Sequence, residues 1–404
     1  MRIAAVTATW IRAPIPPERQ HVSDFGRMTT FDTCLVRIET DTGLVGYGEA
    51  KTHVGSAGRY EAVCTVIERE LAPLLLGADP RDVTGIWERL YNGSRAPYVA
   101  DTGRTFPVLG RRGITLCAIS GIDLALWDLV GRALGVPVWQ LLGGRCRASI
   151  AAYASGGWAP VGEIGAQARA YVDRGFRAVK IRVGAMDGTV DVSAARVAEL
   201  RAALGPDVRI MIDAHGTLGV REAQRLCRLI EAHDLTWFEE PVSPDDLPGM
   251  AEVRASTLVP IAAGESEQTR FAFRDMALAR AVDVFQPDPS ICGGLTEAAR
   301  IAALASAFQL QVAPHLWGSA VLFAAGLHLA AACPACTILE YPHGHNPLLH
   351  DLVHERFEMV DGRVLVPDRP GLGITIRDDF VREYAYDWQR EEPTRGRAEG
   401  DTGS

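Results

Sequence analysis

Residues 208–240, VRIMIDAHGTLGVREAQRLCRLIEAHDLTWFEE, contain one complete strand–helix–strand unit. The apolar runs Val208–Ile212 and Thr236–Phe238 predict two buried strands, and the amphipathic stretch 220–233 between them predicts a helix. Six more runs of this kind occur at Ile150–Ala154, Ala178–Val183, Ile261–Ala263, Val282–Phe285, Gln311–Ala313 and Thr337–Leu339. The eight runs are spaced by roughly 25 residues, with helical stretches such as 163–174, 192–204 and 295–307 between them, which predicts a (β/α)8 barrel.

The chain before the barrel has the pattern of a small α+β module. Its first residues predict an edge strand, and Cys34–Thr40 alternates apolar and polar residues before a turn at Asp41–Leu44 leads into a second strand at Val45–Ala50. Residues 57–76 and 113–134 have helical periodicity, and the Gly-, Pro- and Arg-rich stretch 93–112 predicts a loop.

After Glu340 the sequence pattern predicts irregular segments and short strands, with Arg363–Val366 and Gly373–Ile376 as candidate strands. We therefore expect four parts. Residues 1–125 form the α+β module and residues 126–345 the barrel. Residues 346–389 form a segment that packs back on the module, and residues 390–404 form a disordered, charged and Gly-rich tail.

Composition places the chain among cytoplasmic enzymes. A net charge of −9 over 404 residues argues against a nucleic-acid partner or a polybasic membrane surface. We expect no membrane span, because the nearest apolar run, Ala320–Cys333, is shorter than the ~18 residues required. The start lacks an apolar signal-peptide core, and eight scattered cysteines are typical of a reducing compartment. Cys333 and Cys336 form the one CxxC, which we interpret as buried structural thiols rather than a redox or metal site.

Ionisable residues end almost every predicted barrel strand. In strand order they are Lys180 and Arg182, Asp213 and His215, Glu239 and Glu240, Glu265, Asp288, His315, and Glu340. Active sites of such barrels lie at the carboxyl ends of the strands, so these groups predict a catalytic centre.

Asp213, Glu239 and Glu265 are 26 positions apart each time, on three adjacent strands. Neighbouring strand ends are ~5 Å apart, where two carboxylates repel by roughly 3 kcal/mol at an effective dielectric near 20. Three such groups need protons or a cation. Oxygen ligands favour Mg²⁺ or Mn²⁺ over a metal that prefers thiolates. The alternative is three separate salt bridges at the barrel rim.

The remaining groups indicate an anionic substrate and acid–base chemistry. Lys180 and Arg182 are two apart and face the same way, which favours a bound carboxylate, although they could also balance the acidic cluster. Asp288 beside His315 makes a candidate general base, on the side of the mouth opposite the Lys180/Arg182 pair; the alternative is a structural pair.

Two further residues, His215 and Glu340, each allow several roles. His215 could be a fourth metal ligand, a hydrogen-bond donor to substrate, a general acid, or a structural residue. Glu340 could bind a substrate carboxylate if it is protonated, or it could make a rim salt bridge.

The ordered set of motifs resembles the enolase superfamily, in its mandelate racemase/muconate lactonizing enzyme branch. The match includes Ile38–Ala50, the helix Ile119–Leu129 with Trp127 and Asp128, and residues 141–144, Leu-Leu-Gly-Gly. The resemblance implies an N-terminal capping domain over the barrel and a homo-oligomer. It implies metal ligation by Asp213, Glu239 and Glu265, a His315–Asp288 base, and a functional Glu340. It also implies Mg²⁺-stabilised enediolate chemistry.

Two departures from the racemase pattern point to a dehydratase. Where racemases have a second lysine base this chain has Arg182, which stays protonated and is a poor proton acceptor. His215 stands where racemase-like members often have Asn, and it resembles the Asp-x-His arrangement of sugar-acid dehydratases. The resemblance thus implies β-elimination of water from an aldonate or aldarate of R configuration at C2, giving a 2-keto-3-deoxy acid. His315 would act as base, His215 as acid, and Lys180 with the metal would bind the carboxylate.

The sequence allows two alternative functions. One is an epimerase or lactone cycloisomerase that uses the same intermediate, and the other is a binding or regulatory protein on an inactive barrel. Substrate contacts are expected from loops 16–30, with Arg19, His21 and Arg27, and 51–60, with Lys51 and His53. The Arg-rich stretch 104–112 is a candidate contact for a distal carboxylate.

Overall fold

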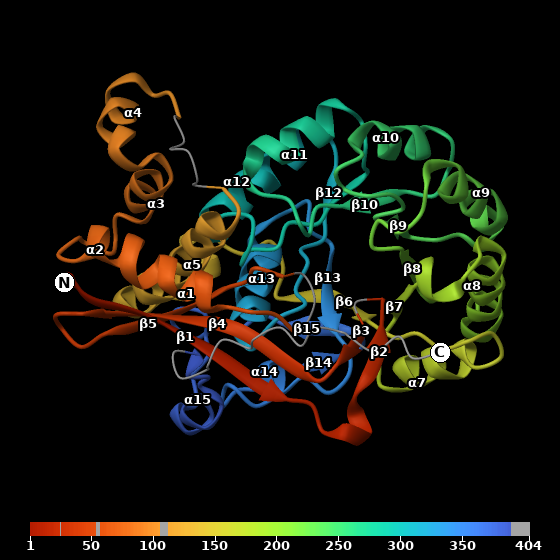
Figure 1. The fold of residues 1–404 in the computed structure, drawn as a ribbon, viewed down its shortest axis with the longest axis horizontal. Coiled ribbons are helices and arrows are strands. Elements are labelled where there is room, and N and C mark those ends of the chain that lie inside the picture. The colour runs from red at the N-terminus through yellow and green to blue at the C-terminus, as the bar shows by residue number, and fades with distance from the viewer. Residues whose placement is uncertain (25, 54–56, 106–111, 389–404) are drawn as a thin grey trace, which may run out of the picture.

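The computed structural model describes residues 1–24, 26–53, 57–105 and 112–388, and its centre is the predicted barrel (Figure 1). The barrel strands are β6 Ser149–Ser155, β7 Ala178–Arg182, β8 Arg209–Asp213, β9 Trp237–Glu239, β10 Ile261–Ala263, β11 Val284–Phe285, β12 Gln311–Val312 and β13 Ile338–Pro342. Parallel pairing runs in sequence from β6 to β12, β13 pairs with β6, and a bridge from Val312 to Cys336 closes the ring. The predicted (β/α)8 fold is confirmed.

One side chain from each strand fills the barrel interior as an apolar layer. These residues are Tyr153, Ala178, Met211, Trp237, Ala262, Val284, Ala313 and Ile338. Because successive side chains on a strand point to opposite faces, the neighbours of these residues point outward against the surrounding helices.

The outer helices are α7 Ile164–Asp173, α8 Val190–Leu204, α9 Val220–Ile230, α10 Leu247–Ala255, α11 Thr269–Leu278, α12 Gly294–Ala307 and α13 Ala320–Ala332. In α9, the buried residues Ala223, Leu226, Cys227 and Ile230 have the i, i+3, i+4, i+7 spacing of an amphipathic helix. The helical prediction for residues 220–233 is therefore correct, with its last three residues in a 3-10 turn, Glu231–His233.

The N-terminal capping domain contains a three-stranded antiparallel sheet of β1 Ile3–Pro14, β4 Thr30–Thr40 and β5 Val45–Ala50, with β1 at one edge as expected. A small hairpin, β2 His21–Ser23 and β3 Gly26–Met28, extends from it. Its helical parts are α1 Glu61–Thr65, the π-helix Val66–Leu71, α2 Ala72–Leu75, α3 Val83–Asn92, α4 Ala96–Thr102 and α5 Ile114–Leu134, followed by the short α6 Val138–Leu141.

Helix α5 packs directly on β5 because both surfaces lack side chains at the contact. A Cβ atom added at Gly48 would lie 1.9 Å from the carbonyl oxygen of Gly121. In the described part of the chain α5 is also the one helix long and apolar enough to cross a membrane, and most of its apolar window is buried. The expectation that no apolar run reaches that length is therefore wrong for α5, which is apolar because it is buried inside the protein.

The loop predicted for residues 93–112 is wrong over its first half, where a 3-10 turn, Gly93–Arg95, leads into α4. Pro97 lies in the first turn of α4, where proline favours a helix start rather than breaking it, and Gly103 ends the helix in the left-handed conformation. Residues 106–111 lie outside the described residues.

The C-terminal segment contains α14 Pro347–His350, β14 Met359–Val360, β15 Arg363–Leu365 and α15 Asp378–Tyr384. Strand β15 pairs antiparallel with β6, and the backbone N–H of Tyr386 donates to the carbonyl of Trp10 in β1. Residues Gly373–Ile376 form no strand, which corrects that prediction, because turns at Gly371 and Gly373 with positive φ leave a single bridge from Ile376 to Val353. The predicted disordered tail, 390–404, lies outside the described residues.

All eight cysteines are free thiols, and seven of them are buried, including Cys333 and Cys336. Burial raises the pKa of both thiols of this CxxC.

The buried carboxylate of Asp128 on α5 ties the capping sheet to the C-terminal segment. It accepts hydrogen bonds from the backbone N–H of Tyr47 at 2.9 Å, from that of Leu372 at 2.8 Å, and from Arg132 Nε at 2.8 Å. We predict that Asp128→Asn lowers the free energy of unfolding by about 2–3 kcal/mol, because an amide nitrogen would face a donor. Urea denaturation measures this effect, and Asp191→Asn, at an exposed ion pair, is the control. Equal stability of both variants would contradict this role for Asp128.

Candidate active site

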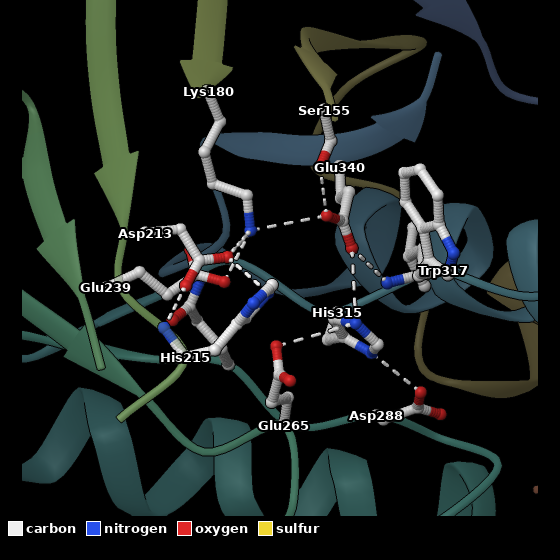
Figure 2. Close-up of polar contacts among 12 residues, drawn as sticks. Ser155, Lys180, Asp213, His215, Glu239, Glu265, Asp288, His315, Trp317 and Glu340 are labelled. Carbon is white, nitrogen blue, oxygen red and sulfur yellow. Dashed lines mark hydrogen bonds and ion pairs between the residues drawn. The ribbon is translucent and has the colours of Figure 1, made fainter. Parts of the chain in front are cut away.

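A polar layer lies directly above the apolar interior of the barrel. Two residues beyond each interior side chain, the inward register continues with Ser155, Lys180, Asp213, Glu239, Gln286, His315 and Glu340. All seven are buried. Strand β10 differs, since Gly264 has a φ of 131° and Glu265 follows Ala262 by three residues. The alternation of strand residues therefore brings the predicted groups together (Figure 2).

Asp213, Glu239 and Glu265 form a buried trio, in which one carboxylate oxygen of each lies within 4.8 Å of the others. Burial, with the charges of Asp213 and Glu265 nearby, raises the pKa of Glu239 to about 7 despite the attraction of Lys180. Hard oxygen donors crowded in this way match the ligands that Mg²⁺ or Mn²⁺ prefers. The trio therefore fits a divalent cation.

Lys180 reaches into this trio from β7. Its Nζ lies 3.2 Å from Asp213 Oδ2 and 3.4 Å from Glu340 Oε1, and it donates a short hydrogen bond to Glu239. Burial alone would lower the pKa of Lys180, but these carboxylates raise it well above its usual value. Lys180 is thus an ammonium that balances part of the acidic charge. It also lines a small hollow at the barrel mouth, together with Asp213, Glu265, His315 and Glu340.

Two donors hold Glu239 in place. Trp237 Nε1 and Gln286 Nε2 donate to Glu239 Oε2 at 3.0 and 2.6 Å, which leaves its other oxygen facing Lys180. Glu240, beside it, is also buried, with a raised pKa and, within the described residues, no hydrogen bond to its Oε1.

His315 and Asp288 form the predicted dyad. His315 Nδ1 lies 2.8 Å from Asp288 Oδ2, so Nδ1 is the protonated nitrogen and Nε2 faces the carboxylates, 3.5 Å from Glu265 Oε2 and 3.9 Å from Glu340 Oε2. Burial would lower the pKa of His315, but Glu265, Glu340 and Asp288 together raise it to about 9.

The end of β5 supports this dyad from the capping domain. Lys51 is buried, its Nζ lies 3.7 Å from Asp288 Oδ2, and it donates a short hydrogen bond to the carbonyl of Trp317. Glu49 accepts from the N–H of Ser319 at 3.1 Å and from that of Leu322 at 3.0 Å, at the N-terminus of α13. Lys51, expected from the sequence among the substrate contacts, lies behind Asp288 instead.

His215 belongs to a second charged group, completed by a residue that sequence analysis missed. Its Nε2 lies 3.1 Å from Asp213 Oδ2, and its Nδ1 lies 2.5 Å from Oδ2 of Asp24, in the β2–β3 hairpin. Burial would lower the pKa of His215, but Asp213 and Asp24 raise it well above its usual value. Arg182 Nη1 pairs with Asp24 Oδ1 at 3.1 Å. Asp24 is one of several charged residues in a polar loop, and only the fold shows which one faces the barrel.

Glu340 is ionised, contrary to the protonated role considered from the sequence. Ser155 Oγ donates to it at 2.5 Å and the N–H of Leu316 at 2.7 Å. Burial would raise the pKa of Glu340, but Lys180, His315 and these donors lower it to about 2. Glu340 therefore acts as a buried anion beside Lys180 and His315.

The capping-loop candidates separate in space. Arg19 lines a second hollow, which shares Gly156, Arg182 and Trp317 with the hollow that contains the carboxylates, whereas Arg27 is exposed. His53 is absent from the lining of the carboxylate-bearing hollow and packs edge-to-face on Tyr60, with ring centroids 6.0 Å apart. The backbone of His21 lies in β2, and its side chain is outside the described part. Most of stretch 104–112 is likewise outside it.

Comparison with known proteins gives the same family over both domains. The family model described as mandelate racemase/muconate lactonizing enzyme, N-terminal domain, matches residues 6–143, and the one described as enolase C-terminal domain-like matches residues 163–380. The chain is 38% identical over 363 residues to the D-galactarolactone cycloisomerase of Agrobacterium fabrum, covering 87% of this chain and 90% of the relative. It is 34% identical over 351 residues to the arabinonate dehydratase of Saccharolobus solfataricus, covering 86% and 89%.

Among solved structures, the chain is similar to a racemase from Streptomyces coelicolor A3(2) with bound magnesium. The TM-score is 0.82 at 32% sequence identity, and the match covers 95% of this chain and all of that one. A barrel with a capping domain, a carboxylate trio on adjacent strands, and matches over both domains lead to one conclusion: the chain belongs to the mandelate racemase/muconate lactonizing enzyme family of the enolase superfamily.

Proposed function

We propose that this protein is a sugar-acid dehydratase that works with a divalent cation, Mg²⁺ or Mn²⁺. It removes the proton next to the carboxylate of an aldonate or aldarate and expels the neighbouring hydroxyl as water, giving a 2-keto-3-deoxy acid. The observation that carries the proposal is the pair of histidines at the carboxylate trio, His315 held by Asp288 and His215 held by Asp24. The similarity to an arabinonate dehydratase supports this reaction. We also propose a cytoplasmic location, which the free thiols support because disulfides are rare in that compartment.

His315 is the general base. Asp288 fixes its Nδ1–H, so Nε2 of the neutral ring accepts the substrate proton, and Lys51 keeps Asp288 ionised and in place. A cation held by the trio would offset the charge of Glu265 and so favour that neutral ring. The pKa of Asp288 is below its usual value: burial would raise it, but Lys51 and His315 lower it. Lys180 presents its ammonium to the substrate carboxylate. Asp213, Glu239 and Glu265 would hold the cation, which would supply positive charge to stabilise the anionic intermediate. The similarity to a racemase with bound magnesium supports a cation in this site.

His215 is the general acid. Its two carboxylate neighbours favour the imidazolium form, which can give a proton to the departing hydroxyl. The proton from carbon goes to His315, the carbon–oxygen bond breaks, water leaves with the proton of His215, and the enol becomes the keto acid. Arg182 stays protonated and supplies no second base, which disfavours racemisation.

A lactone cycloisomerase is the second candidate, favoured by the 38% identity to the D-galactarolactone cycloisomerase. That reaction would use the same base and the same anionic site. The two candidates differ in the leaving group, which is water in one and a ring oxygen in the other.

A panel of aldonates, aldarates and their lactones in D₂O separates these reactions. We predict a semicarbazide-reactive keto acid from at least one open-chain sugar acid, because His215 can protonate a leaving hydroxyl. EDTA should abolish turnover, and Mg²⁺ or Mn²⁺ should restore it. A deuterated acid that keeps all its hydroxyls would indicate an epimerase, and conversion of lactones alone would indicate a cycloisomerase; either contradicts the dehydratase.

The variant His215→Asn tests the separate roles of the two histidines, His315 as base and His215 as acid. We predict that it eliminates water about 10²–10⁴-fold more slowly but still exchanges the proton next to the carboxylate with D₂O, because His315 is intact. The matched variant His315→Asn should lose both exchange and elimination, with Mg²⁺ affinity nearly unchanged. NMR measures exchange and elimination in one sample, and calorimetry measures metal affinity. Loss of exchange in His215→Asn would contradict its role as acid only.

A further inference from the structure

Helix α12 of the barrel takes its N-terminal cap from the capping domain. Its own N-cap residue is Gly293, which has no side chain to accept a hydrogen bond from the first turn. The buried carboxylate of Asp123, on α5, accepts instead. Its Oδ2 lies 2.9 Å from the backbone nitrogen of Thr296, the third residue of α12, and its Oδ1 lies 2.6 Å from Thr296 Oγ1. Asp123 thus does the work of an N-cap side chain from 173 positions away.

Two further side chains on the same face of α5 extend this contact. Ser120 Oγ accepts from the backbone N–H of Gly293 at 2.9 Å, and Trp127 Nε1 donates to the capped threonine hydroxyl at 3.0 Å. Ser120, Asp123 and Trp127 are three and four positions apart, so they lie side by side on the helix. A Cβ atom at Gly294 would lie 2.2 Å from Asp123 Oδ2, so glycine is needed for this close approach. The start of α12 is therefore fixed against α5.

The turn that leads into α12 carries the carboxylate of the dyad. Asp288 lies five residues before Gly293. Ser290 donates to Asp288 Oδ1 through its backbone N–H at 2.7 Å and its hydroxyl at 2.5 Å, and the N–H of Cys292 donates to the Asp288 carbonyl at 2.8 Å. Asp288 Oδ2 faces His315. Because hydrogen bonds join Asp288 to the start of α12, a displacement of that start would move Asp288 relative to His315.

We infer that Asp123 is a positioning residue for the general base: by capping α12 from the capping domain, it holds the turn that aims Asp288 at His315. The inference rests on the proposed function for the role of His315 as base. The alignment of His315 with Asp288 can be measured without substrate, so the inference and the proposed reaction can fail separately.

The cap works through an oxygen acceptor in either charge state of Asp123. Burial raises the pKa of Asp123 to about 7, although the hydrogen bonds of Thr296 and the charge of Arg300 lower it. Near neutral pH the group therefore exists in both forms, and each form keeps an oxygen for the N–H of Thr296. Asparagine offers the same oxygen without the charge, whereas alanine offers none. Asp123→Asn should therefore keep the positioning that Asp123→Ala removes.

Steady-state kinetics with a sugar acid that the protein converts test this role. In Asp123→Ala we predict that kcat falls on the order of 10- to 100-fold with KM nearly unchanged, since misplacing a catalytic group by about 1 Å can cost this much. Asp123→Asn should recover most of kcat. Ser120→Ala, which leaves the N–H of Gly293 unpaired, should give a smaller loss in the same direction.

The matched control is Asp246→Ala. Asp246 caps α10 from its own segment and accepts from the backbone N–H of Gly249 at 2.9 Å. Its removal also uncaps a barrel helix, so thermal unfolding should show a loss of stability, but α10 does not follow the turn of Asp288 and kcat should be retained.

NMR of protein with isotopically labelled histidine and no substrate gives a readout that a merely structural cap would not move. The Nδ1–H resonance of His315, identified by its absence in His315→Asn, reports the hydrogen bond to Asp288. It should shift in Asp123→Ala and less in Ser120→Ala, and it should keep its position in Asp123→Asn and Asp246→Ala. Ser120→Ala decides the question should Asp123→Ala fail to fold.

An unchanged resonance in Asp123→Ala and Ser120→Ala overturns the positioning role even if keto acid forms. An equal loss of kcat in Asp246→Ala also overturns it, because the effect would then follow from uncapping any barrel helix. A shifted resonance in a protein that forms no keto acid supports the positioning of Asp288 and overturns the proposed reaction.

Discussion

Mutual repulsion among buried carboxylates is the constraint on which the rest of the structure depends. Asp213, Glu239, Glu265 and Glu340 lie at the barrel mouth, almost completely removed from water. Burying even one unpaired charge is costly, and several together require compensation. Lys180 and His215 supply positive charge, and neutral donors such as Trp237 and Ser155 supply hydrogen bonds. A set of side chains that costs stability in this way is expected where its charge is used for chemistry.

The sequence predicted the barrel and the centre of the site because both follow from local rules. Apolar runs located all eight strands, and the two-residue alternation carried Lys180, Asp213, Glu239, His315 and Glu340 inward above the apolar layer. Local rules failed where distant segments meet. Glu49 contacts Ser319 across 270 positions and Asp24 contacts His215 across 191, and no periodicity marks either residue. The ionised state of Glu340 also depends on Ser155 and Lys180 being beside it, which the fold alone reveals.

The capping domain does more than cover the barrel. Through Lys51 it fixes Asp288 and the loop of Trp317, and through Asp24 it holds His215 and Arg182. Each of the two histidines at the carboxylate trio therefore has a supporting carboxylate: Asp288, from the barrel, for His315, and Asp24, from the capping domain, for His215. In the proposed reaction, this arrangement would keep the bond-breaking groups on rigid strand ends and leave recognition of the rest of the substrate to loops between the two domains.

The most direct test of this account is anomalous diffraction from crystals of the protein soaked in Mn²⁺. We predict one strong peak at the barrel mouth, bound by oxygens of Asp213, Glu239 and Glu265 at ~2.1 Å, with His315 Nε2 facing the space beside it. A mouth without a peak, or a peak bound by other side chains while these three carboxylates point apart, would contradict it.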